Sequence, residues 1–376
     1  MGETDTHLSQ VNLVLDSNVF VADFRMSGSG FHTLLNELVR TGHKLYVPQV
    51  VVDEAVNKYR EWLKKCKDNI DKEIRDLNKR AGISNLCRSI SDRRIDELVG
   101  NFEDVLTERL LSVDAQICPY PDVTHEELVE RALRRRKPFS ENGRGYRDAL
   151  IWETVRDIAR NTTEPVVFVT DNVADFCTSD DALHSDLCAD LTDYDISPER
   201  VSVIRKLDAF VDQYVKPWLE KLDNVKAQLS REEYPGFNLS KEVQKAIPSH
   251  LQGALLYAAS LGFPPQYEDP TVHEVLGVSD IQVTDVRRLS ESDLLICVQA
   301  EVECTVIFFV RKAYFYTISP ENAPYVWNAD YDEQRVGAAA SKQIRVEVWL
   351  TFDEKQHDVT WMSIESAWDQ SIYNAS

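Results

Sequence analysis

Short apolar runs bounded by charged or turn-forming residues mark the first half of the chain. Residues 11–15 and 166–170 are nearly continuous apolar runs, and residues 44–47 and 200–205 are further short stretches of this kind. A continuous apolar run suits a strand that is buried on both faces, whereas a strand with one wet face alternates. Helical spacing fills the intervals between the runs, so the pattern predicts βαβ units around a parallel sheet.

A long helical segment interrupts this alternation of strand and helix. Residues 60–135 are rich in charged positions and have apolar residues at helical spacing, for example Ile95 and Phe102, which indicates a helical insertion. Near its end, Thr124 and Glu127 have the spacing of a capping box, which predicts the start of a helix that carries several arginines.

The last third of the chain changes character after Pro264 and Pro265. Apolar and polar residues alternate along residues 344–352 and again along residues 358–368, with a turn between the two segments. Alternation with a period of two predicts an antiparallel hairpin, and residues 294–311 are likewise rich in strand-forming residues.

We therefore predict an α/β fold class in three parts. The first is a three-layer domain built on a parallel sheet with a helical insertion, the second a helical connector, and the third a separate antiparallel β-rich domain. The predicted boundaries are residues 8–207 for the first domain, about 60–135 for its insertion, 208–263 for the connector and 264–376 for the β-rich domain.

The net charge limits how this chain could meet a nucleic acid. A formal charge of −21 argues against a surface that coats a polyanion, so such contact has to be local, and a basic stretch between Arg131 and Arg147 is the exception. No apolar run approaches the ~18 residues that a membrane span needs. Seven scattered cysteines without a C-x-x-C pair indicate reduced thiols. We therefore expect a cytoplasmic protein without a membrane partner.

Four carboxylates lie where predicted strands end or the following helices begin. Asp16 and Asp175 follow two strands, while Glu54 and Asp148 lie in early turns of two helices, the first of which we expect to begin at Pro48. Because the carboxyl ends of parallel strands meet at one edge of a sheet, we expect the four to converge. Carboxylates that meet need a cation, and Mg²⁺ or Mn²⁺ prefers oxygen ligands and serves phosphodiester hydrolysis. The residues therefore predict a site for one of these ions.

Four short motifs around these acids resemble those of the PIN-domain nucleases. Residues 11–18 (VNLVLDSN) are similar to the opening strand and D-x-N of that family, and residues 47–54 (VPQVVVDE) to its strand, proline and helix-borne glutamate. Residues 145–152 (GYRDALIW) resemble its third motif, as in larger bacterial PIN-like proteins related to VapC-type toxins, and residues 167–176 (VFVTDNVADF) its closing turn. The resemblance covers about residues 8–210 and implies that the four acids bind metal.

The fourth acidic position has two candidates in the last motif. Asp171 and Asp175 stand on either side of Asn172; we favour Asp175 as the matching carboxylate, with Asn172 shaping the turn, and keep Asp171 as the alternative ligand. Asn18 and Thr170 are candidates for hydrogen bonds that orient the metal-binding carboxylates.

Basic residues near Asp148 are candidates for holding a substrate phosphate. Arg144 and Arg147 flank this aspartate, and Arg136 and Lys137 end a basic run a few residues earlier. A guanidinium can hold a phosphate through two hydrogen bonds or can pair with the acids. The alternative for the run that ends at Lys137 is a solvated helix face.

Together these observations predict a metal-dependent endonuclease, with RNA preferred over DNA on the resemblance alone. The alternative is a catalytically silent PIN-like module that binds nucleic acid or serves as a scaffold under the control of the β-rich domain, and the intact set of acids argues against it. For the β-rich domain we expect a regulatory protein or ligand as partner. The two-module layout suits a toxin-like or defence nuclease, and the sequence leaves the oligomeric state open.

Overall fold

The structure is a computed structural model that describes residues 9–81, 89–180 and 182–369. The chain forms two compact units, residues 1–219 and 220–376, each with its own hydrophobic core. Within the described ranges, no helix is both long enough and apolar enough to cross a membrane.

Helices fill the segment that was predicted as a connector, and its boundaries at residues 207 and 263 stay predictions. These helices are α9 (Leu207–Phe210), the π-helix η2 (Val211–Val215), α10 (Lys216–Ser230), α11 (Leu239–Leu251) and the 3-10 helix η3 (Ala259–Leu261).

Unit 1 is built on a five-stranded parallel sheet with the strand order β3-β2-β1-β4-β5. The strands are β1 (Asn12–Leu15), β2 (Lys44–Pro48), β3 (Gln116–Cys118), β4 (Val166–Val169) and β5 (Val201–Ile204). Both β1 and β4 are buried along their whole length, which is why they read as continuous apolar runs. The predicted parallel sheet is confirmed, and β3 escaped prediction because three residues, one exposed and two half-buried, carry no period.

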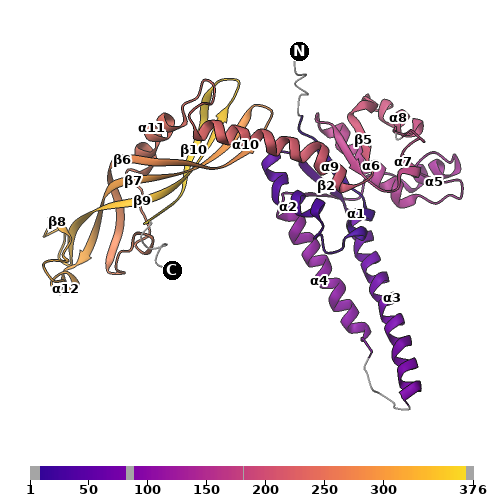
Figure 1. Ribbon diagram of the computed structural model, residues 1–376, viewed down its shortest axis with the longest axis horizontal. Helices are drawn as coiled ribbons and strands as arrows, with labels where there is room; N and C mark the ends of the chain where they lie inside the picture. Colours follow the sequence, from indigo (N-terminus) through magenta and orange to yellow (C-terminus); the bar gives the residue numbers. More distant parts are fainter. Residues whose placement is uncertain (1–8, 82–88, 181, 370–376) are drawn as a thin grey trace. The chain divides into compact units, whose positions relative to one another are not determined.

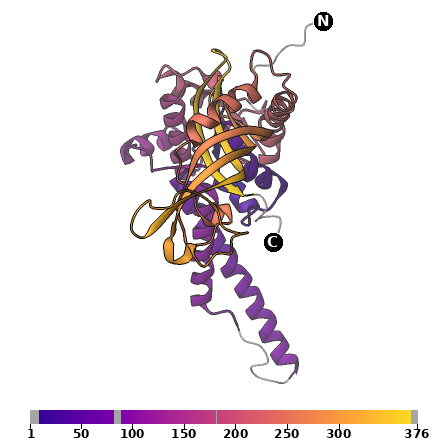
Figure 2. The same cartoon turned by 90° about the vertical axis from the view of Figure 1, so that its left-hand side faces the viewer.

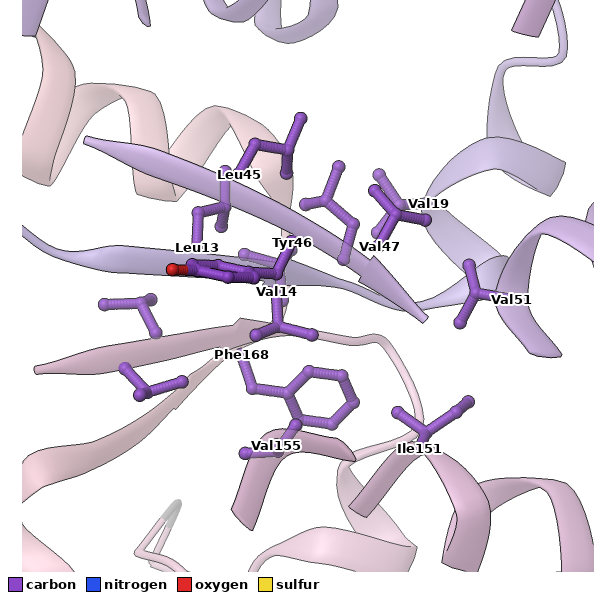
Figure 3. Close-up of a cluster of buried hydrophobic side chains, with 14 of the residues drawn as sticks. Leu13, Val14, Val19, Leu45, Tyr46, Val47, Val51, Ile151, Val155 and Phe168 are labelled. Carbon is purple, nitrogen blue, oxygen red and sulfur yellow. The ribbon is translucent and has the colours of Figure 1, made fainter. Parts of the chain in front are cut away.

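Helices connect the strands of this sheet and cover it. They are α1 (Ser17–Ala22), α2 (Ser29–Thr41), α3 (Gln49–Ala81), α4 (Asp92–Leu111), α5 (His125–Leu133), α6 (Tyr146–Asn161), α7 (Val173–Phe176), α8 (Ser185–Thr192) and the 3-10 helix η1 (Pro198–Arg200). Val14 is in register with Tyr46 and Phe168, so the three side chains share one face of the sheet, where Val155 of α6 packs (Figure 3). Leu13 points to the opposite face, as the alternation along a strand requires.

The segment predicted as a helical insertion, residues 60–135, contains a hairpin of two helices that extends from unit 1, but also strand β3 of the sheet and α5. The first turns of α3 are buried and its later turns are exposed, and α4 runs beside it (Figure 1). Arg60 forms an ion pair with Asp96 at 2.5 Å, and the rings of Tyr59 and Phe102 stack with centroids 4.4 Å apart. The helix that carries the catalytic candidate Glu54 is therefore the same helix that forms this arm.

Pro48 ends a strand and does not begin a helix, so the predicted start of the helix was wrong by one residue. In β2, Pro48 lies in register with Cys118 of β3, and α3 begins at Gln49. The helix begins one residue later than predicted because Pro48 keeps an extended backbone and is paired with β3. Glu54 still falls in the second turn of α3.

Unit 2 contains a long antiparallel sheet with the order β10-β9-β7-β6, and β8 pairs with β9. Its strands and short helix are β6 (Tyr267–Arg288), β7 (Asp293–Arg311), α12 (Lys312–Phe315), β8 (Tyr325–Asn328), β9 (Arg335–Asp353) and β10 (Asp358–Asp369). Figure 2 shows the twist of this sheet. Val243 and Ile247 of α11 belong to the same hydrophobic core as the buried side chains of the sheet. The predicted hairpin and the predicted separate antiparallel domain are confirmed.

Candidate active site

Asp16 lies at the carboxyl end of β1 and is the N-cap of α1. Its Oδ1 accepts a hydrogen bond from the backbone N–H of Ser17 at 2.6 Å. Its Oδ2 accepts from the amide of Asn18 at 2.7 Å and from the hydroxyl of Thr170. Only 3% of Asp16 is exposed, so three donors hold a nearly buried carboxylate in one orientation.

The turn after β4 links this carboxylate to a second one. The hydroxyl of Thr170 donates to Asp16 and accepts from the side-chain amide of Asn18 and the backbone N–H of Asn172, each at 3.0 Å. Its donor and both of its lone pairs are therefore used. The side-chain amide of Asn172 in turn donates to Oδ1 of Asp148 at 3.0 Å. A chain of hydrogen bonds thus runs from Asp16 to Asp148 across the ends of β1 and β4, and the residues predicted to orient the acids lie in it.

Glu54 joins the same edge of the sheet from α3. Its side chain is 11% exposed, and Oε2 accepts from the hydroxyl of Ser17 at 3.0 Å, while that hydroxyl also lies 3.3 Å from Oδ1 of Asp16. The other oxygen, Oε1, forms an ion pair with Arg147, which directly precedes Asp148 in α6. The sequence interpretation missed Ser17, although its place between the two polar residues of the D-x-N motif was a usable signal.

Burial and neighbouring charges shift the pKa values of two of these acids. Burial raises the pKa of Asp16 from 3.8 to about 6; the hydrogen bonds from Thr170 and Ser17 oppose this rise, and the charges of Asp148 and Glu54 add to it. Burial also raises the pKa of Asp148, with the hydrogen bond from Asn172 lowering it and nearby carboxylates raising it. The site therefore holds more negative charge than its surroundings stabilise.

Asp175 lies in the short helix α7 and faces both an acid and a base. Its charge is one of the causes that raise the pKa of Asp148. The ammonium of Lys137 lies 3.4 Å from Oδ1 of Asp175 and donates to the carbonyl of Ala174 at 2.7 Å. Lys137, predicted to hold a substrate phosphate, is thus paired with a candidate metal ligand.

Asp171, the alternative fourth ligand, is placed differently. It is exposed, and it lines a hollow together with Asn18. Of the two candidates, Asp175 is the one whose charge raises the pKa of Asp148.

The helix that begins with the capping box was expected to carry the arginines, and that prediction was wrong, because most of the basic run lies beyond its end. The alternative of a solvated helix face does not hold for this run either. The predicted capping box of α5 is confirmed, but α5 ends at Leu133, and the left-handed backbone of Arg135 (φ 51°) turns the chain away. Arg136 donates to the buried carboxylate of Asp190 at 2.8 Å. Sequence reasoning missed Asp190, which no motif marks. The backbone carbonyl of Arg144 accepts hydrogen bonds from the N–H and the hydroxyl of Ser140, and among the described residues its guanidinium has no hydrogen-bond or ion-pair partner.

The donors at this edge suit a hard divalent cation by their chemistry. They are carboxylate and amide oxygens, and the Oδ1 atom of Asn18, although buried, accepts no hydrogen bond from any described residue, a gap that a cation or a water could fill. As the side chains stand, no three acidic, histidine or cysteine side chains in the described ranges are grouped to hold a metal ion. Hydrogen-bonding groups lie between the acids, and Arg147 and Lys137 each pair with one of them.

Comparison with known proteins identifies part of this unit. Residues 13–176 match a family model described as a PIN domain. No curated protein and no solved structure matches the chain.

Proposed function

Because residues 13–176 belong to the PIN domain family, we propose that this chain is a metal-dependent nuclease that hydrolyses phosphodiester bonds. The observation that carries the proposal is the meeting of Asp16, Glu54 and Asp148 from three distant segments, with the pKa of Asp16 raised to about 6. Groups whose pKa is strongly shifted by burial and by like charges are candidates for a functional site. Asp175 completes the proposed set of four carboxylates.

The carboxylates of Asp16, Glu54, Asp148 and Asp175 would hold Mg²⁺ or Mn²⁺. When bound, such an ion supplies positive charge for the phosphate and makes a water more acidic. The hydrogen bonds from Thr170 and Asn172 keep two of the carboxylates oriented before an ion arrives.

Arg147 would exchange its partner when ion and substrate bind. It is half exposed and pairs with Glu54, so it neutralises a proposed ligand as long as no cation does. With Glu54 engaged as a metal ligand, the Arg147 guanidinium would be free at the rim of the site, where it could hold a phosphate through two hydrogen bonds. Lys137, paired with Asp175, is suited to the same exchange. Arg144 is proposed as a further phosphate contact, while Arg136 is held by Asp190 and would act by positioning the loop.

RNA as the preferred substrate, cleavage that leaves 5′-phosphate ends, and a cytoplasmic, toxin-like or defence role rest on the family resemblance. The β-rich unit 2 is proposed to bind a regulatory protein or ligand.

Calorimetric titration with Mn²⁺ and cleavage assays on labelled RNA and single-stranded DNA test the core of the proposal. We expect Asp16→Asn and Asp148→Asn to lose both the heat of Mn²⁺ binding and cleavage. Asp53→Asn is the matched control, because Asp53 adjoins Glu54 in α3 but is exposed and accepts hydrogen bonds from Gln49 and Tyr120. If the heat of Mn²⁺ binding is the same for the wild type and Asp16→Asn, and neither protein cleaves, the silent binding module is favoured.

A further inference from the structure

The antiparallel sheet of unit 2 ends in two edge strands, β6 and β10, whose outer edges are used differently. A segment that precedes β6 pairs with its edge: the N–H of Gly253 donates to the carbonyl of Val272 at 2.8 Å, and the N–H of Leu256 donates to the carbonyl of Pro270 at 2.8 Å. Within the described ranges, no segment pairs with the outer edge of β10 along residues 358–367. Backbone N–H and C=O groups along this edge are therefore available to another strand.

The hydrophobic core of unit 2 is closed over β9 and open at β10. Met362 and Ile364 of β10 lie in register with Leu350 and Val348 of β9, so the four side chains face the same side of the sheet. Leu350 and Val348 are fully buried, whereas Met362 and Ile364 are half-buried, although they pack against the same core. A further strand beside β10 would bury these two side chains, as β10 buries those of β9.

A hollow of about 560 Å³ lies along this edge. Residues 362–367 of β10 form one wall, and residues 254–257 with the end of α11 form the other. Because successive residues of a strand point to opposite faces, a hollow lined by an unbroken run of them follows the edge of the strand. A second hollow of about 360 Å³ continues it along residues 358–362, where α11 is the facing wall. We call the two hollows together the β10 groove.

The β10 groove has the length and the walls that an extended peptide needs. Along residues 358–367 it is about 30 Å long, at the ~3.3 Å per residue of a strand. It lies between an edge strand and a helix, which packs beside β10 (Figure 1). In such a place a peptide can add to a sheet through its main chain while its alternate side chains enter pockets. Leu255 and Tyr257 in the wall that faces β10 are 67% and 84% exposed, so an added strand would cover them.

The charge of the β10 groove is negative. The charged residues of β10 are Asp358, Glu365 and Asp369, and the strand contains no lysine, arginine or proline, which are the residues that commonly protect an edge strand from pairing. Among the described residues that line the groove, Glu242 adds a third acid, and Lys245 is the one lysine or arginine. Acids along the edge favour a basic strand and oppose a second copy of β10, because pairing two such strands brings like charges together.

From the unpaired edge, the open core and the acidic wall, we propose that the β10 groove binds an extended basic segment of a partner protein, which adds to β10 as a further strand. Apolar side chains on one face of the segment enter the groove beside Met362 and Leu255. Lysine or arginine side chains on its other face meet Asp358 and Glu365. This inference rests on the partner-binding role proposed for unit 2, to which it gives a place and a chemistry, and it does not depend on nuclease activity.

Peptides of designed sequence test the proposal without any change to the protein. The probe is a fluorescent peptide of alternating valine and lysine, and its binding to the full chain is measured by anisotropy at low ionic strength, where surface charges are least screened. One control peptide carries N-methyl groups on every second backbone nitrogen, which keeps its side chains and charge but removes N–H donors from one edge. A second control peptide has glutamate in place of lysine. We expect both controls to bind much more weakly than the probe.

Two substitutions place the peptide in the β10 groove, and each has a matched control in the same sheet. Glu365→Lys should weaken binding of the probe about fivefold or more, because it turns an attraction into a repulsion. Glu303→Lys, at an exposed glutamate of β7 outside the groove, should leave it unchanged. Leu255→Ser should weaken binding several-fold by removing apolar wall, and Leu276→Ser, at an exposed leucine of β6, should not. All four side chains are exposed, so the variants should fold.

An N-methylated peptide that binds as tightly as the probe would overturn the proposal, because charge alone would then account for binding. Equal binding by Glu365→Lys and Glu303→Lys would overturn it too, since the peptide would then lie elsewhere on this acidic chain. Sedimentation of the wild type tests another occupant: a dimer that the probe dissociates would identify a second copy of the chain in the groove, against the proposal.

Cleavage of RNA with Mn²⁺, measured on the same proteins, reports on the acidic edge of unit 1 separately. A chain that shows the predicted differences in peptide binding but cleaves no RNA would support the β10 groove and refute the nuclease. A chain that cleaves RNA but binds the probe and both control peptides equally would support the nuclease and refute the groove.

Discussion

Asp16→Asn should change the way in which the stability of the protein depends on pH, independently of any catalysis. Burial raises the pKa of Asp16 from 3.8 to about 6, and this difference of roughly two units corresponds to about 3 kcal/mol. The folded protein binds this proton more tightly than the unfolded chain does. The contribution to stability is therefore fully present below about pH 4 and is lost as the pH rises through about 6. Asparagine has no such proton and loses nothing.

The comparison of two pH values isolates this effect from the other consequences of the substitution. Asn keeps one acceptor oxygen and loses the other, so some of the hydrogen bonds from Thr170 and Asn18 are weakened, but that cost does not vary with pH. His43 titrates in the opposite sense, because burial lowers its pKa to about 4, so its stabilisation is lost as the pH falls. The pH dependence of the wild type alone would therefore mix opposing contributions, whereas the difference between the two proteins leaves the contribution of His43 out.

Scanning calorimetry in EDTA at about pH 4.5 and about pH 7.5 measures the difference. Between these values the wild type should lose about 2 kcal/mol relative to Asp16→Asn, which for a unit of this size is about 4–8 °C in Tm. Because the two units need not unfold together, the comparison uses the unfolding transition whose Tm the substitution changes. Asp53→Asn, exposed on α3, should run parallel to the wild type. If Asp16→Asn also runs parallel, the carboxylate is not destabilised as the structure implies, and the argument for a missing cation fails.

Three further substitutions test the surroundings of the site. Arg147→Met should tighten Mn²⁺ binding measured by calorimetry, because it frees Glu54, and yet slow RNA cleavage; weaker Mn²⁺ binding would contradict the proposed exchange. Gly145→Ala should lower stability in urea unfolding by about 2 kcal/mol or more, because its φ is +124° and a Cβ would lie 2.5 Å from a backbone oxygen, whereas Gly100→Ala, with open space around it in α4, should gain about 0.5–1 kcal/mol. Asp190→Asn should cost about 3–5 kcal/mol by the same measurement, since it removes the buried carboxylate that pairs with both Arg131 and Arg136; a cost below about 1 kcal/mol would show that water or Glu153, 4.0 Å from Arg131, compensates for the loss.

The sequence was informative about the sheet wherever burial leaves a local pattern. Strands β1 and β4 are buried on both faces, so their composition alone marked them, and the alternation along β9 and β10 marked the antiparallel unit. Strand β3 has one apolar and one thiol side chain in three residues, which is too short for any period. Its position in the sheet depends on pairing with β2, and a local sequence pattern does not predict that contact.

The candidate site likewise has a part that local sequence predicts and a part that it does not. The acids could be predicted because each follows a strand or opens a helix, and those positions are local. The partners of the basic residues could not, because Arg147 meets Glu54 and Arg136 meets Asp190 across long separations in sequence. A run of arginines looks the same in sequence whether it faces solvent or a buried aspartate. Ser17 shows the remaining limit, since its role depends on a hydroxyl direction that only the approach of α3 defines.

The central position of β1 has a consequence for synthesis of the chain. On one side Leu13 pairs with Leu45, which follows soon after it, but on the other it pairs with Val167, which leaves the ribosome only after the whole helical arm and α6. Closing so long a loop is slow, because its entropy is lost before the pairing contributes. Asp16 and Glu54 can therefore meet early, while the hydroxyl of Thr170 and the carboxylate of Asp148 join them last. A nascent or truncated chain that ends before β4 holds three of the four acids and none of the turn that orients them, so the acidic edge is assembled only when the unit is nearly complete.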